Sequence, residues 1–95
     1  MKYSIILSPE AKESLENLKG SIRSLVKDGI VEYLSNEPEK VSKSRIKRLK
    51  GIERPQFRLR IGDIRIYYDV SGNTVEILEI VNKKMAAAWL ERNKN

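Results

Sequence analysis

The chain has 95 residues and a formal net charge of +6, which suits one domain, so we expect residues 1–95 to form a single unit. It contains no cysteine and no histidine, which excludes disulfides, thiolate nucleophiles, histidine-assisted catalysis and histidine-based metal sites, and we expect no cofactor. No segment approaches the roughly 20 apolar residues that cross a bilayer, so we expect a soluble cytoplasmic protein.

The first part of the chain predicts a strand followed by a short helix. Apolar and polar side chains alternate over residues 3–7, which indicates a strand with one buried face. Ser8 and Pro9 then supply a helix cap and a first helical residue, and Gly20 can end that helix.

A second helix has the clearest periodicity in the sequence. Its apolar residues recur at helical spacing until Pro38 stops the helix. They are Ile22, Leu25, Val26, Gly29, Ile30, Tyr33 and Leu34. We expect the two helices to form a hairpin whose apolar face needs a partner surface.

The second half of the chain predicts a basic loop over residues 39–55, three strands and a C-terminal helix within residues 82–95. The strands cover residues 56–61, 64–70 and 74–81. The expected fold is α+β: a four-stranded, mainly antiparallel sheet with the helical hairpin on one face. The other face of the sheet is expected to stay partly open.

The stretch "FRLRIGDIRIYYDV" loads arginines onto the middle of this sheet. If Gly62 and Asp63 form a two-residue turn, Arg60 faces Arg65 and Arg58 faces Tyr67. These four side chains then share one face. The opposite face, toward the core, carries Phe57, Leu59, Ile61, Ile64, Ile66 and Tyr68.

The excess positive charge is concentrated around the same stretch. Residues 40–65 carry a local net charge of +8, whereas the rest of the chain carries −2. A like-charge pair across two strands costs up to about 1 kcal/mol, so three arginines beside a tyrosine favour a cradle for phosphate. The alternative is that acids pair with the arginines as ordinary surface charges; the candidates are Asp69, Glu76 and Glu79.

Other residues allow two interpretations each. The basic loop can contact nucleic acid or be a solvated lysine-rich loop; its candidate RNA-binding residues are Lys43, Arg45, Lys47, Arg48 and Lys50. Lys83 and Lys84 can close the cradle or be plain solvated charges. Trp89 can stack on a base or cover the core.

The segment "RLKGIERPQFRLRIGDIRIYYDV", followed by "VEILEIVNKK", resembles the RelE/ParE superfamily of toxins from type II toxin–antitoxin pairs. The likeness covers nearly the whole chain and implies a microbial-ribonuclease-like RelE fold. It also implies one of two activities: ribosome-dependent messenger-RNA cleavage, as in RelE toxins, or inhibition of DNA gyrase, as in ParE toxins.

The resemblance further implies a set of site residues. Arg58, Arg60 and Arg65 match basic strand residues of the RelE cleavage site, and Lys83 falls where that branch has an arginine. Trp89 falls at or beside the position of a family tyrosine. Arg65 and Lys83 would stabilise the phosphate, Arg58 and Arg60 would orient it, and Lys50 or Tyr67 would assist proton transfer.

Three functions follow from the residues and the resemblance. The favoured one is a messenger-RNA endonuclease, or mRNA interferase, that acts on the ribosome and inhibits translation. The alternatives are a gyrase inhibitor without nuclease activity and a degenerate, non-toxic nucleic-acid-binding module. In each case we expect a cognate antitoxin, a small protein encoded adjacently, whose acidic or amphipathic segment wraps the domain.

Overall fold

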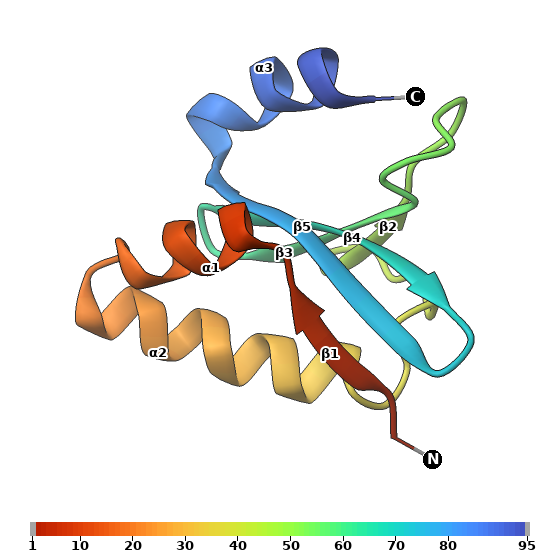
Figure 1. Ribbon diagram of the computed structural model, residues 1–95, viewed down its shortest axis with the longest axis horizontal. Helices are drawn as coiled ribbons and strands as arrows, with labels where there is room; N and C mark the ends of the chain where they lie inside the picture. Colours follow the sequence, from red (N-terminus) through yellow and green to blue (C-terminus); the bar gives the residue numbers. More distant parts are fainter. Residues whose placement is uncertain (1, 95) are drawn as a thin grey trace.

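A five-stranded mixed sheet forms the centre of the computed structural model, which describes residues 2–94 (Figure 1). The strands are β1 (Ser4–Leu7), β2 (Ile46–Arg48), β3 (Phe57–Ile61), β4 (Ile64–Ser71) and β5 (Thr74–Asn82). Their order across the sheet is β1-β5-β4-β3-β2, with β1 parallel to β5 and every other neighbouring pair antiparallel. The predicted α+β class is confirmed.

Helices lie on both sides of this sheet. They are α1 (Pro9–Glu16), α2 (Gly20–Gly29) and α3 (Lys83–Asn93), with a π-helical segment η1 (Ile30–Leu34) that continues α2. Figure 1 shows α3 above the sheet and the α1–α2 hairpin below it. Ser8 caps α1 as predicted, because its Oγ accepts a hydrogen bond from the Ala11 N–H at 3.0 Å. Among the described residues, no helix is both long and apolar enough to span a bilayer.

The main core lies between the helical hairpin and the sheet. Val26, Ile30 and Leu34 pack there against the alternate residues of β3 and β4 that face the helical hairpin. Those strand residues are Phe57, Leu59, Ile64, Ile66 and Tyr68, with Ile61 half-buried beside them. This is the core face predicted from the turn, so the alternation along the two strands is confirmed.

The expected number of strands in the sheet was wrong. The basic loop contains a fifth strand, β2, whose Ile46 pairs with Leu59 of β3. Three residues are too few to give a strand periodicity in the sequence. The second sheet face stays partly open, as expected: α3 packs on one part of it through a small cluster around Leu49, Tyr67 and Ala86, while Lys47 and Arg60 remain exposed.

The apolar stripe of the second helix is only partly buried, which corrects the sequence-based expectation. Val26, Ile30 and Leu34 are buried, whereas Ile22 and Leu25 in the first turns of α2 are exposed. Helix α2 follows the predicted periodicity to Gly29 and then continues as the π-helical η1, but the underlying sheet and α1 do not cover the N-terminal half of α2. An apolar surface is therefore left without a partner within the described chain.

Tyr68 joins the sheet to the loop after η1, and its removal is expected to have a pH-dependent effect. Its buried hydroxyl donates a hydrogen bond to the Pro38 carbonyl at 2.6 Å. We expect Tyr68→Phe to lower the free energy of unfolding by about 1–3 kcal/mol at neutral pH, because the Pro38 carbonyl loses its donor.

Burial also raises the pKa of Tyr68, and the nearby Glu39 carboxylate acts in the same direction. Above about pH 10 the unfolded phenol loses its proton while the folded one keeps it, so stability falls as the pH rises. In Tyr68→Phe, the part of this loss of stability at high pH that comes from Tyr68 should be absent. Urea unfolding of both proteins at neutral pH and above about pH 10 checks this; equal losses in both would contradict it.

Candidate functional site

The β3–β4 hairpin places three arginines on the sheet face that α3 partly covers. Arg60 pairs with Arg65 and Arg58 pairs with Tyr67, which is the register predicted by counting outward from the two-residue turn. Leu59, between two of the arginines, points into the main core, so its neighbours must point the other way. Arg58, Arg60 and Arg65 are called the arginine cluster below.

The arginines of this cluster repel one another. The pKa of Arg65 is lowered, first by its partial burial and then by the positive charges of Arg60 and Arg58. Its Nη1 donates to the Gly62 carbonyl at 2.9 Å, which holds the guanidinium near the hairpin turn. An arginine keeps its charge in a protein, so the cluster is a fixed concentration of positive charge.

The acids that could have neutralised the cluster face other partners. Asp69 accepts from Arg54 Nε at 2.6 Å, and Glu76 accepts from Arg54 Nη2 at 3.3 Å. Glu79 accepts from Ser14 Oγ at 2.6 Å. Within residues 2–94 no ion pair joins an acid to the arginine cluster. The positive charge of the cluster is therefore not neutralised by an ion pair within the described residues.

Arg58 carries a further sign of an incomplete site. It is half-buried between Lys47 of β2 and Tyr67 of β4. Its Nε is buried and has no hydrogen-bond partner in the part of the chain described. A buried donor without an acceptor costs free energy, so an oxygen ligand that reached this nitrogen would gain a hydrogen bond.

Helix α3 covers the neighbouring Tyr67. The rings of Tyr67 and Trp89 stack with centroids 4.9 Å apart and planes 17° from parallel. Tyr67 is 3% exposed, so its ring offers no open face to a base in this arrangement, and Trp89 covers a hydrophobic cluster. Burial raises the pKa of Tyr67, although the charges of Arg58 and Arg65 oppose the shift.

Lys83 lies beside the turn of the hairpin. Its N–H donates to the Asp63 carbonyl at 2.7 Å, and its Nζ lies 3.7 Å from Asp63 Oδ1. Lys84 is exposed in the same first turn of α3. Cations at a helix N-terminus oppose the helix dipole, so this pair of lysines does not stabilise α3. The structure brings Lys83 to the end of β4 at which Arg65 lies.

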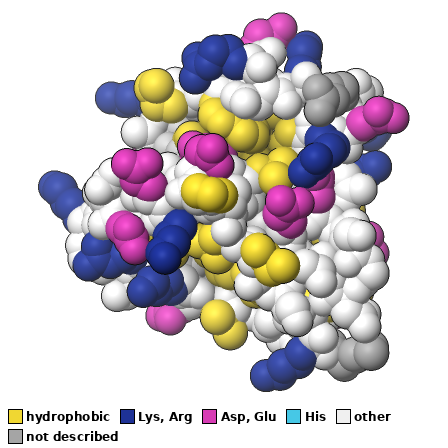
Figure 2. All heavy atoms as spheres, viewed as in Figure 1, with side chains coloured by type: hydrophobic (Ala, Val, Ile, Leu, Met, Phe, Trp, Pro, Cys, Tyr) yellow, Lys and Arg dark blue, Asp and Glu magenta, His cyan; other side chains and the backbone are white. Residues whose placement is uncertain are grey.

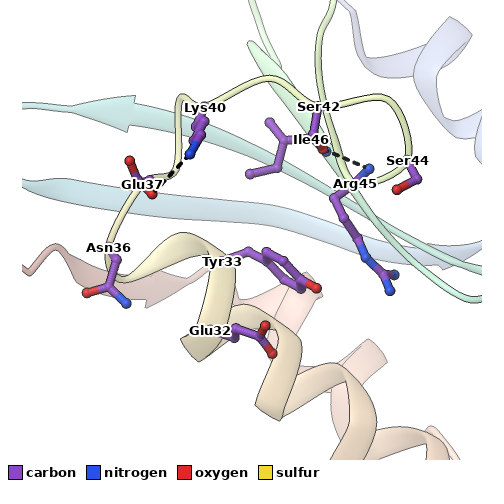
Figure 3. Close-up of a pocket in the computed structure, with 9 residues that line it drawn as sticks. All are labelled: Glu32, Tyr33, Asn36, Glu37, Lys40, Ser42, Ser44, Arg45 and Ile46. Carbon is purple, nitrogen blue, oxygen red and sulfur yellow. Dashed lines mark hydrogen bonds and ion pairs between the residues drawn. The ribbon is translucent and has the colours of Figure 1, made fainter.

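The basic loop divides between the two sides of the sheet. Lys47 pairs with Arg58 and shares the face of the arginine cluster. Arg48 and Arg45 reach the opposite side, with Cζ atoms 5.1 Å from the Phe57 ring centroid and 5.4 Å from the Tyr33 ring centroid respectively. Figure 3 shows Arg45 beside Tyr33, where both line a pocket of about 510 Å³. Lys43 and Lys50 are exposed.

Sequence reasoning missed how the strand that carries Arg58 is held in place. Asp69 accepts from Arg54 and also, at 2.7 Å, from the Gln56 N–H. The Gln56 side chain in turn accepts from the Val70 N–H at 2.8 Å. These bonds tie the residues before β3 to β4. The alternation along β4 already indicated that Asp69 shares a face with Tyr67. The sequence could not show that Arg54, from the loop before β3, bonds to Asp69.

Arg60→Thr is expected to stabilise the protein. The substitution removes the like-charge pair with Arg65 and introduces a residue that favours strands, so the free energy of unfolding should rise by a few tenths to about 1 kcal/mol. Urea unfolding at low salt measures this. The gain should shrink in about 1 M salt, where charges are screened; a loss of stability at low salt would contradict the repulsion.

Comparisons with known proteins agree with this fold. The family model described as the ParE toxin of the type II toxin–antitoxin system parDE matches residues 5–87. The comparison with curated proteins gives no match.

Three solved structures illustrate the likeness. In the RelB–RelE antitoxin–toxin complex of Methanococcus jannaschii, the matched chain is 25% identical, with 88% of this chain and 96% of that chain covered and a TM-score of 0.69. In the toxin–antitoxin complex RelBE2 of Mycobacterium tuberculosis, the matched chain is 27% identical. The match covers 86% of this chain and 99% of that chain, with a TM-score of 0.65. A free-state double mutant of the E. coli toxin RelE shares the fold at 19% identity, with 96% and 94% covered and a TM-score of 0.70.

The fold is therefore that of the RelE toxins. The family model spans most of the chain, so the chain belongs to the ParE toxin family of type II toxin–antitoxin systems, within the RelE/ParE superfamily.

Proposed function

We propose that this toxin is a ribosome-dependent messenger-RNA endonuclease that inhibits translation. The observation that supports the proposal is the arginine cluster, three guanidiniums on one sheet face without acid partners among the described residues. Holding like charges together opposes folding, and a phosphate group would relieve that repulsion. Lys47 and Lys83 extend the positive surface along the strands on either side.

The proposed reaction is transfer within the RNA itself. A 2′-hydroxyl attacks the adjacent phosphorus, the bond from phosphorus to the 5′-oxygen of the next nucleotide breaks, and the products are a 2′,3′-cyclic phosphate and a 5′-hydroxyl. Arg65 and Lys83 would stabilise the charge that develops on the phosphate oxygens, and Arg58 and Arg60 would orient the group.

Proton transfer in this reaction falls to Tyr67 or Lys50. A phenol is protonated at neutral pH and burial raises the pKa of Tyr67 further, so this residue could donate a proton to the leaving 5′-oxygen but not remove the 2′-hydroxyl proton. Because Tyr67 is 3% exposed beneath Trp89, this role requires Trp89 to move away from it. Lys50 is exposed on the loop before β3.

Induction of the toxin alone tests the function. Mapping of 5′ ends by primer extension should reveal new ends within translated messages. A matched message without its start codon should remain intact, because the proposed cleavage needs a ribosome. Intact translated messages during full growth arrest would refute the proposal.

A second candidate is inhibition of DNA gyrase without nuclease activity. It is favoured by the match to the ParE toxin model. The resemblance also places Lys83 where the RelE branch has an arginine, and Trp89 at or beside the position of that branch's tyrosine. Lysine lacks the two-pronged geometry of arginine, and an indole cannot accept a proton as a phenolate can. This activity predicts accumulated cleaved DNA complexes and uncut messages in the same induction. Unchanged growth would instead indicate a non-toxic nucleic-acid-binding module.

We also propose that an antitoxin neutralises this chain. The similar structures from Methanococcus jannaschii and Mycobacterium tuberculosis are both toxin–antitoxin complexes. A small protein encoded by an adjacent reading frame is the expected partner, and its co-expression should restore growth and suppress the new RNA ends.

A further inference from the structure

A pocket of about 510 Å³ lies beside β2, the edge strand of the sheet. One wall is formed by η1 and the residues just after it, and the other by the loop that leads into β2 (Figure 3). Pockets that hold small ligands have volumes of roughly 300–1,000 Å³, so the size suits a single nucleotide. We call this hollow the edge pocket.

Arg45 is held in a fixed position at the loop wall of the edge pocket. Its Nη1 donates to the Arg60 carbonyl at 3.1 Å, and its Cζ lies 5.4 Å from the centroid of the Tyr33 ring. Within residues 2–94 no acid forms an ion pair with Arg45. A guanidinium has five N–H donors, so Arg45 keeps donors and an unneutralised charge for a phosphate group.

Tyr33 supplies an aromatic ring to the same pocket. The residue is half-buried and packs against the main core, so the ring is held in place by its neighbours. Figure 3 shows the ring reaching toward the loop wall, with Glu32 beside it on η1. Proteins stack unpaired bases on aromatic rings and on guanidinium planes, and the edge pocket offers one of each.

Polar side chains surround the Tyr33 ring. Glu32 and Asn36 line the pocket and are exposed, and no ion pair engages Glu32 in the part of the chain described. Carboxylate and amide oxygens accept hydrogen bonds from base amino groups and from ribose hydroxyls. An aromatic ring, a cation and acceptors in one hollow suit a nucleotide better than an apolar ligand or a bare phosphate.

The loop wall of the edge pocket is fixed by Ser42. Its Oγ accepts from the Arg45 N–H at 3.1 Å and from the Ile46 N–H at 3.3 Å. The Ser42 N–H in turn donates to the Ile46 carbonyl at 3.0 Å. These bonds order the turn before β2 in the absence of a ligand, and a pre-formed wall lowers the entropy cost of binding.

The edge pocket adjoins the arginine cluster around the edge of the sheet. The Arg60 N–H donates to the Arg45 carbonyl at 2.9 Å, so an arginine of the cluster and the arginine of the pocket are direct neighbours. Their side chains lie on opposite sides of the sheet, and β2 is the last strand between them and the sheet's edge. An RNA strand on the cluster can therefore pass around β2, along the exposed Lys47, and reach the pocket.

The opposite edge of the sheet, formed by β1, has a different charge pattern. Figure 2 shows the molecule from the side on which β1 lies, with acidic side chains interspersed among basic ones. The excess positive charge lies instead within residues 40–65, which include β2 and most of the loop wall. A net positive stretch attracts a polyanion, whereas mixed charges do so weakly. An RNA strand is therefore expected at the β2 edge.

We propose that the edge pocket binds one unpaired nucleotide of an RNA strand, with its base against Tyr33 and its phosphate on Arg45. The choice of RNA as the ligand rests on the proposed function, whereas the pocket itself is separate from the cleavage chemistry. Messages and ribosomal RNA both contain unpaired nucleotides with the same groups, and the test distinguishes the two sources.

The test compares Tyr33→Leu, Tyr33→Phe and Tyr3→Leu in the Arg65→Ala toxin, which permits expression. Leucine keeps apolar packing without a ring, and phenylalanine keeps the ring. Tyr3 is the matched control, because it is also half-buried against the core but does not line the pocket. Fluorescence anisotropy measures dissociation constants for a short unstructured RNA and for a duplex of the same sequence, whose paired bases cannot stack on a side chain. Urea unfolding checks that each variant is folded.

We expect Tyr33→Leu to weaken binding of the single strand by about 5–100-fold, the effect of losing one stacking ring. Its affinity for the duplex should stay within about twofold of the parent, because duplex binding depends on phosphate contacts. Tyr33→Phe should keep most of the single-strand affinity. Unchanged single-strand affinity in Tyr33→Leu, equal weakening by Tyr3→Leu, or an equal loss for the duplex would each overturn the proposal and leave the Arg45–Tyr33 contact as a link between the loop and η1.

A second pair of variants tests the phosphate contact without changing the packing of Tyr33 against the core. Arg45→Gln removes the guanidinium of the pocket, and Lys12→Gln removes one exposed positive charge on α1. We expect Arg45→Gln to weaken single-strand binding several-fold more than Lys12→Gln does, because Arg45 contacts the phosphate directly. Equal effects of the two changes would mean that Arg45 acts only through net charge, against the proposal.

Ultraviolet cross-linking in cells identifies the source of the nucleotide. RNA joined to the Arg65→Ala toxin is sequenced, and the reads that Tyr33→Leu loses are assigned to messages or to ribosomal RNA. Either assignment supports the site and names its ligand, whereas no loss of reads would contradict it. Tyr33-dependent binding without new RNA ends in the wild-type toxin would refute the nuclease function and leave the edge pocket standing. New RNA ends without Tyr33-dependent binding would do the reverse.

Discussion

Arg65→Ala is expected to reduce message cleavage by about 100–1000-fold, the loss typical when one group that stabilises transition-state charge is removed. Arg65 lies at the turn end of the arginine cluster, its guanidinium oriented by the Gly62 carbonyl. Its removal also relieves repulsion with Arg60, so the folded state should not become less stable through charge. Primer extension after induction, normalised to toxin level, measures the change.

Two further variants test whether the loss of cleavage in Arg65→Ala comes from the missing guanidinium. Arg65→Lys keeps a positive charge but lacks the planar fork of donors, so it should recover part of the activity. Lys12→Ala removes one exposed positive charge on α1, on the opposite side of the sheet, and should leave cleavage unchanged. Cleavage by Arg65→Ala at the wild-type rate would remove the cluster from the reaction.

The geometry of the arginine cluster could be predicted because it depends on a local rule. A two-residue turn at Gly62 and Asp63 fixes which residues of β3 and β4 face each other, and every predicted pair is present. Strand alternation then assigns the faces without reference to the rest of the fold. For the same reason the core face of these strands was predicted correctly.

Contacts between distant segments could not be predicted in this way. Strand β2 exists because Ile46 reaches the core beside Leu59, and nothing in a three-residue stretch announces that pairing. The stacking of Trp89 on Tyr67 depends on where α3 turns back after β5. The sides taken by Arg45 and Arg48 depend in turn on β2, so the predicted basic loop divides into two surfaces.

Which acid pairs with which arginine could also not be predicted from neighbouring residues in the sequence. Asp69 shares a strand with Arg65, yet its partner is Arg54, which approaches from the loop before β3. The hydrogen bond and the charge of Asp69 raise the pKa of Arg54. Whether an acid neutralises one arginine or another depends on tertiary geometry, and here that geometry leaves the arginine cluster without acids.

Leu59→Ala is expected to lower the free energy of unfolding by about 2–5 kcal/mol. Leu59 is fully buried, and it lies between Arg58 and Arg60 in β3. Its truncation leaves a cavity beneath the strand that carries the cluster, in a small domain with little stability to spare. Urea unfolding measures the loss. Ile6→Ala, at a residue 54% exposed on β1, should change stability by less than about 0.5 kcal/mol.

Leu59→Ala also separates a loss of fold from a loss of chemistry. The arginines remain, so cleavage per folded molecule should stay near the wild-type value at a temperature where the variant is folded, and total cleavage should fall with the folded fraction on warming. Arg65→Ala should show the reverse, full folding with little cleavage at every temperature. Loss of cleavage in fully folded Leu59→Ala would mean that the cluster depends on packing beneath β3 as well as on its charges.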